Sequence, residues 1–175
     1  MNTTDAKYQQ LLEIAKQHAK VVFINSGEIP GAGKGADGSV PDLYADEGKH
    51  TIYLHNKRLK DPRLRLWVLA HELGHITARN NLKHRGGYLL RNLQGDIQNK
   101  FPGLARAATW IADNVPVIGG PIARGSWYGG RAMMESAANE EGLKHLETIK
   151  ADKKMQEFAK KDSDRYIDDI LYGRV

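Results

Sequence analysis

Apolar residues along the chain follow two patterns, a helical spacing and short continuous runs. Apolar positions three and four residues apart predict a helix over residues 4–19, capped by Thr4, and another over residues 103–115. The runs at residues 21–24 and 51–55 are short and apolar, which is compatible with buried strands. The pattern therefore predicts a mixture of helices with a small amount of sheet.

A third helix is predicted from Asp61 to about Arg79. Aspartate is a favoured cap for the first turn, and Pro62 suits the first helical position. The remaining segments predict helices over residues 131–151 and 163–172, and loops rich in glycine and proline over residues 25–42 and 115–130.

The amino-acid composition excludes several kinds of functional site. The 175 residues contain no cysteine, so disulfides, thiolate metal sites and cysteine nucleophiles are excluded. Any metal must therefore bind His, Asp or Glu. The net charge of +5 could favour an acidic partner, but basic and acidic residues are mixed over residues 150–169 rather than sorted onto one face. This mixing argues against nucleic acid as the partner.

No membrane span and no secretory signal are expected. The most apolar stretch, residues 104–123, is interrupted by charged residues and prolines. The first residues lack a basic region followed by an apolar core. The default expectation is a cytoplasmic protein, with a virion or a secreted location by another route left open. The oligomeric state is also open.

The helix predicted from Asp61 carries the sequence HELGH at residues 71–75. Residues four apart on a helix lie about 40° apart around the axis and about 6 Å along it, so His71 and His75 can face one ion with Glu72 beside them. This HExxH spacing is typical of zinc peptidases. The alternative, two histidines that share a helical turn without a metal, stays open.

A catalytic zinc usually takes three protein ligands, so a third ligand must come from elsewhere. Six residues beyond His75, where other zinc peptidases carry a ligand, the chain has Asn81, and His84 comes three residues too late. Glu135 is the better candidate, because it shares a helical face with an amide and with small residues that permit close helix contact. That face comprises Glu135, Ala138, Asn139, Gly142 and Leu146, and Gly74 and Ala78 are matching small residues on the HELGH helix. The alternative is a solvated helix acid.

Two metallopeptidase families resemble parts of this sequence. HELGH followed 60 residues later by Glu135-x-x-Ala138-Asn139-x-x-Gly142 is similar to the signatures of the HtpX-type metallopeptidases, a gluzincin group. The stretch from residue 51 to His71 is similar to the ImmA/IrrE metallopeptidases. The chain has Asn139 where HtpX-type enzymes usually have aspartate, and it lacks their membrane spans. In the ImmA/IrrE group the gap to the third ligand is usually shorter.

The resemblance implies a zinc-dependent endopeptidase acting on a protein or peptide substrate. His71, His75 and Glu135 would be the zinc ligands, Glu72 the general base and Asn139 the residue that orients a ligand imidazole. Four residues are candidate oxyanion donors that the spacing does not separate: His145, Tyr166, Arg165 and Tyr128. Strand 51–55 is expected either as an edge for substrate pairing or as a core strand. The alternative function is a zinc-binding regulatory or structural module without turnover.

The expected fold is α+β and zincin-like. It has a small, mostly antiparallel sheet, an active-site helix beside it and a helical C-terminal half that returns Glu135 to the metal. No repeat or linker divides the chain, so residues 1–175 are expected to form one domain. Its core spans residues 51–147, and residues 148–175 form a helical extension.

Overall fold

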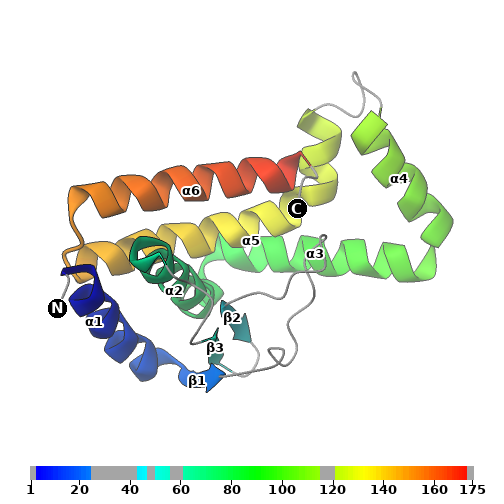
Figure 1. Ribbon diagram of the computed structural model, residues 1–175. Helices are drawn as coiled ribbons and strands as arrows, with labels where there is room; N and C mark the ends of the chain where they lie inside the picture. Colours follow the sequence, from blue (N-terminus) through cyan, green and yellow to red (C-terminus); the bar gives the residue numbers. More distant parts are fainter. Residues whose placement is uncertain (1–2, 25–42, 47–49, 56–60, 115–120, 173–175) are drawn as a thin grey trace. The chain divides into compact units, whose positions relative to one another are not determined.

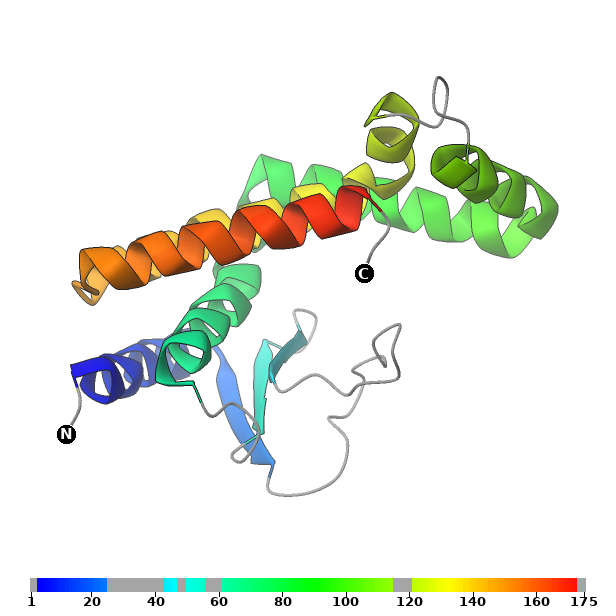
Figure 2. The same ribbon diagram turned by 45° about the horizontal axis from the view of Figure 1, so that its top comes forward.

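A computed structural model describes residues 3–24, 43–46, 50–55, 61–114 and 121–172 (Figures 1 and 2). The described chain is mostly helical with a small sheet, which confirms the α+β class. The helices are α1 (Thr3–His18), α2 (Pro62–Thr77), α3 (Leu82–Lys100), α4 (Pro102–Asn114), α5 (Pro121–Thr148) and α6 (Lys153–Leu171), with a 3₁₀ turn over Ala78–Asn80. The strands are β1 (Lys20–Ile24), β2 (Leu43–Asp46) and β3 (Thr51–His55). The predicted loop over residues 25–42 lies outside the described residues.

The sheet is mixed, with the strand order β1-β3-β2. Strand β3 pairs with β1 in parallel and with β2 antiparallel. The prediction of a mostly antiparallel sheet is therefore wrong. Four residues separate β2 from β3, and so short a connection reverses the chain, whereas β1 is far enough from β3 in the sequence for a parallel crossover. Strand β3 lies between two partners, so it is a core strand rather than an edge.

Contacts between Cα atoms divide the chain into two compact units. The first comprises residues 1–79 and 137–163, and the second comprises residues 80–136 and 164–175. Helices α5 and α6 each pass from one unit to the other. We describe each unit by itself, and the expectation of one domain over residues 1–175 stays a prediction.

The hydrophobic core of the first unit forms where α1, α2, β3 and the α5–α6 connection meet. Removing these apolar side chains from water is the main contribution that holds the unit together. Among its fully or nearly fully buried members are Leu11, Ile52, Leu66, Leu69, Leu73, Leu146 and Ile149. Helix α2, which carries the HELGH sequence, is thus anchored along its length.

Helix α2 begins as predicted. The Asp61 side chain accepts a hydrogen bond of 2.8 Å from the backbone N–H of Arg63, and Pro62 is the first helical residue. The same contact lowers the pKa of Asp61 below its usual value. The start of the helix is therefore determined by neighbouring residues alone.

Helices α5 and α6 form a hairpin, in which they run side by side in opposite directions (Figures 1 and 2). Lys150 has a φ of 53°, and the N–H of Ala151 donates to Leu146 O at 2.9 Å, which is a left-handed helix end. Asp152 then caps α6 by accepting from the N–H of Met155 at 2.8 Å. Helix α6 therefore starts ten residues before the predicted 163–172 segment.

In the second unit α3 packs closely against α5. A Cβ added to Gly87 would lie 2.5 Å from Gly130 O, and one added to Gly130 would lie 2.8 Å from Arg91 N. One of the glycines that predicted a loop over residues 115–130, Gly130, therefore serves a helix contact, and α5 already begins at Pro121, while residues 115–120 lie outside the described residues. No helix is predicted over residues 82–100, where the structure has α3. No helix in the described ranges is long and apolar enough to cross a membrane.

Candidate metal centre

Helix α2 directs two imidazoles at one point. The Nε2 atoms of His71 and His75 lie 3.2 Å apart, and the two rings are nearly perpendicular, at 87°. Two nitrogens bound to one tetrahedral zinc at about 2.0–2.1 Å would be about 3.3–3.4 Å apart. The separation in the protein therefore fits two ligands of a single ion without a change of rotamer.

A carboxylate on α5 completes a group of three ligand side chains. His71, His75 and Glu135 each offer one ligand atom, and these atoms all lie within 4.8 Å of one another. This group could bind a metal ion. The division between the two units falls inside α5, between Ser136 and Ala137, and Glu135 stands just before it on a continuous helix.

Asn139 holds the ring of His71 in place. Its Oδ1 lies 2.7 Å from His71 Nδ1, and its side chain is almost completely buried. An amide oxygen only accepts, so Nδ1 of His71 carries the proton and the neutral ring presents a lone pair at Nε2. Asn139 thus selects the tautomer that a metal requires. Within the described residues, Asn139 Nδ2 has no hydrogen-bond partner.

Small residues let α2 and α5 approach closely enough for this contact. A Cβ added to Gly74 would lie 2.1 Å from Ala138 O, and one added to Gly142 would lie 3.0 Å from Ala70 O. The backbones therefore touch where the two helices cross. The expected close approach is confirmed for Gly74, Ala138 and Gly142. Ala78 is buried in the 3₁₀ turn that follows α2.

Glu72 lies beside the imidazoles on the same turn of α2. It is half-buried, and it stands about 100° around the helix from His71 and about 60° from His75. This position borders the point where the two Nε2 atoms meet. Glu72 thus follows His71 directly on α2, and its role as general base stays a prediction.

One aromatic side chain, Trp67, lies beside the histidines and belongs to the hydrophobic core. Trp67 is nearly fully buried, and its ring centroid lies 6.0 Å from that of His71, with the planes tilted by 59°. Trp67, His71 and His75 follow one another at four-residue spacing on α2. From that spacing alone, the Trp67 side chain could have been predicted to lie next to the histidine pair.

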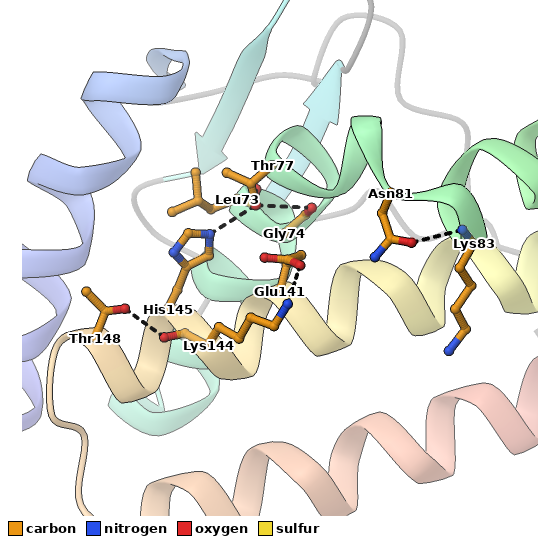
Figure 3. Close-up of polar contacts among 9 residues, drawn as sticks. All are labelled: Leu73, Gly74, Thr77, Asn81, Lys83, Glu141, Lys144, His145 and Thr148. Atoms are coloured by element: carbon orange, nitrogen blue, oxygen red, sulfur yellow. Dashed lines mark hydrogen bonds and ion pairs between the residues drawn. The ribbon is translucent and has the colours of Figure 1, made fainter.

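His145 contacts Thr77 at the end of α2 (Figure 3). Its Nε2 lies 3.0 Å from Thr77 Oγ1, and the Thr77 hydroxyl can also donate to Leu73 O at 3.1 Å. Burial lowers the pKa of His145 below its usual value of 6.5. On α5 this residue lies about 9 Å beyond Asn139 and about 120° around the axis. Its Nε2 is thus engaged with Thr77, and its role as an oxyanion donor stays a prediction.

The other three candidate oxyanion donors belong to the second unit. The guanidinium of Arg131 donates to Tyr166 Oη at 3.2 Å, which holds that phenol against α5. Tyr128 is half-buried on α5, and Arg165 is exposed on α6. Their roles stay predictions.

Two residues were not favoured as the third zinc ligand, Asn81 and His84. Both lie at the start of α3. Asn81 caps α3 by accepting from the N–H of Lys83 at 2.9 Å (Figure 3), and His84 is nearly fully buried on α3. Neither belongs to the group of ligand side chains found in the described residues. Glu141, one turn beyond Ala138, pairs instead with Lys144 at 2.6 Å.

The chain was compared with family models, with curated proteins and with solved structures. No family model, no curated protein and no solved structure matches the chain. The functional assignment therefore rests on the geometry of His71, His75, Glu135 and Asn139.

Proposed function

We propose that this chain is a zinc-dependent endopeptidase. The observation that carries the proposal is the convergence of two imidazole Nε2 atoms, 3.2 Å apart, with His71 held in the metal-binding tautomer by Asn139. Two imidazoles and a carboxylate form a donor set that suits zinc and leaves a fourth position for water. The HELGH sequence gives the pair its general base.

Each residue of the site would have its own role in peptide-bond hydrolysis. Zinc, when bound, lowers the pKa of a coordinated water to about 7 and polarises a carbonyl oxygen. Glu72 would accept a proton from the attacking water and then donate it to the leaving amine. Asn139 would keep the His71 ring fixed throughout, because its amide oxygen accepts from Nδ1.

The proposal includes a zincin-like arrangement of the first unit, as the resemblance to HtpX-type and ImmA/IrrE metallopeptidases implies. An extended substrate pairs with an open sheet edge, and β3 is already paired on both sides. Strand β2 is an outer strand of the sheet and packs against α2. We therefore assign substrate pairing to β2 rather than to β3.

The second candidate is a zinc-binding module without turnover. Asn139 supports it, because a neutral amide stands where HtpX-type enzymes usually carry a carboxylate. A neutral partner makes the imidazole of His71 less basic than a charged one would. Glu72 supports catalysis, because a purely structural site has no need of a base beside its ligands.

The deciding experiment combines metal content with cleavage of a peptide library. Purified protein is expected to contain about one zinc per chain and to cleave peptides. Glu72→Gln should keep the zinc and lose several orders of magnitude in kcat/KM, because the amide retains the shape but cannot take a proton. Zinc without cleavage by the parent would assign the chain to the second candidate.

The ligand set is tested separately. His71→Ala and Glu135→Ala should each lower zinc affinity strongly, since a site reduced to two ligands holds zinc poorly. Glu140→Ala is the matched control, because Glu140 is exposed on the same helix and lies about 140° around the axis from Glu135. Equal zinc content in Glu135→Ala and Glu140→Ala would exclude Glu135 as a ligand and leave the histidine pair intact.

A further inference from the structure

Helices α3 and α4, with Phe101 between them, carry large apolar side chains on their surface. Eight of them are exposed by between 45% and 83%: Leu82, Tyr88, Leu89, Leu90, Leu93, Phe101, Leu104 and Trp110. We call this set the α3–α4 apolar surface. Soluble monomers rarely expose so many large apolar groups in one region, and such regions usually mark an interaction site.

On α3 the exposed leucines form a stripe. Leu89 and Leu93 lie within about 20° of Leu82 around the helix axis. The buried residues of the helix, His84 and Gly87, lie about 140–160° away on the side that packs against α5. The leucine stripe therefore faces away from α5, the helix against which α3 packs. Helix α3 thus has two opposite faces, one packed against α5 and one apolar and exposed.

The charge around this surface is positive. The described side chains over residues 80–110 include five basic residues, Lys83, Arg85, Arg91, Lys100 and Arg106, and one acidic residue, Asp96. Lys100 pairs with Asp96 at 3.7 Å, while Arg85, Arg91 and Arg106 are exposed. Arg85 lies about 60° from the leucine stripe, close enough for its head group to remain in water when the leucines contact an apolar partner.

The combination selects one kind of partner. A second copy of the chain would bring these cations against their own kind, which is unfavourable. A nucleic acid would satisfy the cations but leave the leucines in water. An anionic bilayer satisfies both, because its headgroups attract the cations while leucine and aromatic side chains enter the boundary of the acyl chains.

We propose that the α3–α4 apolar surface docks the protein onto an anionic lipid membrane, with α3 lying in the plane of the interface. The stripe of Leu82, Leu89 and Leu93 enters the bilayer surface, and Arg85 and Arg106 remain at the level of the headgroups. This proposal is independent of the peptidase assignment. It describes surface attachment and not a membrane span.

The experiment is co-sedimentation of the full chain with phosphatidylcholine vesicles, with and without phosphatidylglycerol. Binding is expected only to the anionic vesicles, and it should weaken as salt rises from about 0.05 M to about 0.5 M. Leu89→Asn/Leu93→Asn should lower the partition coefficient about tenfold or more, because both leucines lose their apolar contact with lipid. Arg85→Gln/Arg106→Gln should lower it about 25-fold, at about fivefold per charge.

Each variant has a matched control in the first unit. Phe23→Asn removes an apolar side chain that is 44% exposed on β1, and Lys154→Gln/Lys160→Gln removes two exposed charges from α6. Both controls should bind like the parent, and circular dichroism should show that every variant is folded. Equal losses in variants and controls, or equal binding to neutral and anionic vesicles, would overturn the proposal. A dimer in light scattering that Leu89→Asn/Leu93→Asn converts to a monomer would assign the surface to a second copy instead.

Discussion

Helices α2 and α3 follow one another in the chain but use their leucines in opposite ways. Helix α2 has 16 residues and buries seven, all apolar or glycine, whereas α3 has 19 residues and buries only His84 and Gly87. Both helices start with the same kind of cap, Asp61 and Asn81. The caps are thus alike in the two helices, and the surrounding contacts decide whether a leucine builds the core or covers a surface.

The difference in leucine burial between α2 and α3 bears on their functions. The buried leucines of α2 hold the backbone that presents His71 and His75, so the candidate metal centre is built on a rigid element. The exposed leucines of α3 contribute little to folding and remain available for an interaction. The following predictions test whether substitutions in α2 lower the free energy of unfolding more than substitutions in α3, as their difference in burial implies.

The largest effect is expected at the crossing of α2 and α5. Gly74→Ala places a Cβ 2.1 Å from Ala138 O, so the helices must separate, and we expect a loss of at least about 4 kcal/mol in the free energy of unfolding. Gly95→Ala on α3 is the counterpart, because no atom of the described residues lies within 4 Å of a Cβ added there. It should gain about 0.5–1 kcal/mol. Urea unfolding measures both, and similar values for the two would contradict the close crossing.

A pair of leucines tests the comparison directly. Leu69 is fully buried on α2, so Leu69→Ala should cost about 2–5 kcal/mol in the free energy of unfolding. Leu89 is 71% exposed on α3, and Leu89→Ala should change it by no more than about 0.5 kcal/mol. Thermal and urea unfolding give both values. A cost above about 1.5 kcal/mol for Leu89→Ala would show that its side chain is covered in solution.

Two asparagines separate a role in the metal site from a role in folding. Asn139→Ala should lower zinc affinity about 10-fold to 100-fold, because the His71 ring loses the acceptor that orients it. Asn139→Asp should retain affinity, since a carboxylate accepts from the same Nδ1. Asn81→Ala removes the cap of α3 and should cost about 1 kcal/mol of stability without changing zinc affinity. Competition with a chelator provides the affinities, and equal zinc binding by all three would remove Asn139 from the site.

The smallest effect concerns pH. Burial holds the pKa of His145 below 6.5, so on acidification the unfolded chain takes up its proton first. The stability contributed by neutral His145 is complete above about pH 6.5 and is lost as the pH falls from there toward the folded-state pKa. Metal-free protein should therefore lose slightly more in Tm between about pH 7.5 and about pH 5.5 than His145→Gln does. An identical loss in both would show that His145 does not titrate as a buried group.

Several elements could be predicted from the sequence because their signals are local. Asp61 and Pro62 start α2 without help from distant residues, and the runs at 21–24 and 51–55 coincide with β1 and β3. Glycine-rich segments were the main source of error. Gly87 and Gly130 occur in segments without a predicted helix, yet both lie within helices, where the missing side chain allows close packing.

The sequence by itself determined the class of chemistry of the candidate site. Without cysteine the donors had to be His, Asp or Glu, and the four-residue spacing of His71 and His75 turns both rings to one side of any helix. A resemblance named Glu135 and Asn139 as distant partners, but only the tertiary structure decided that Asn139 contacts His71. Asn139 reaches His71 because Gly74 and Gly142 let two backbones touch, and β1 runs parallel to β3 across a connection too long for any local turn to direct. A local signal acts through neighbouring residues, whereas these contacts depend on the packing of segments far apart in the chain.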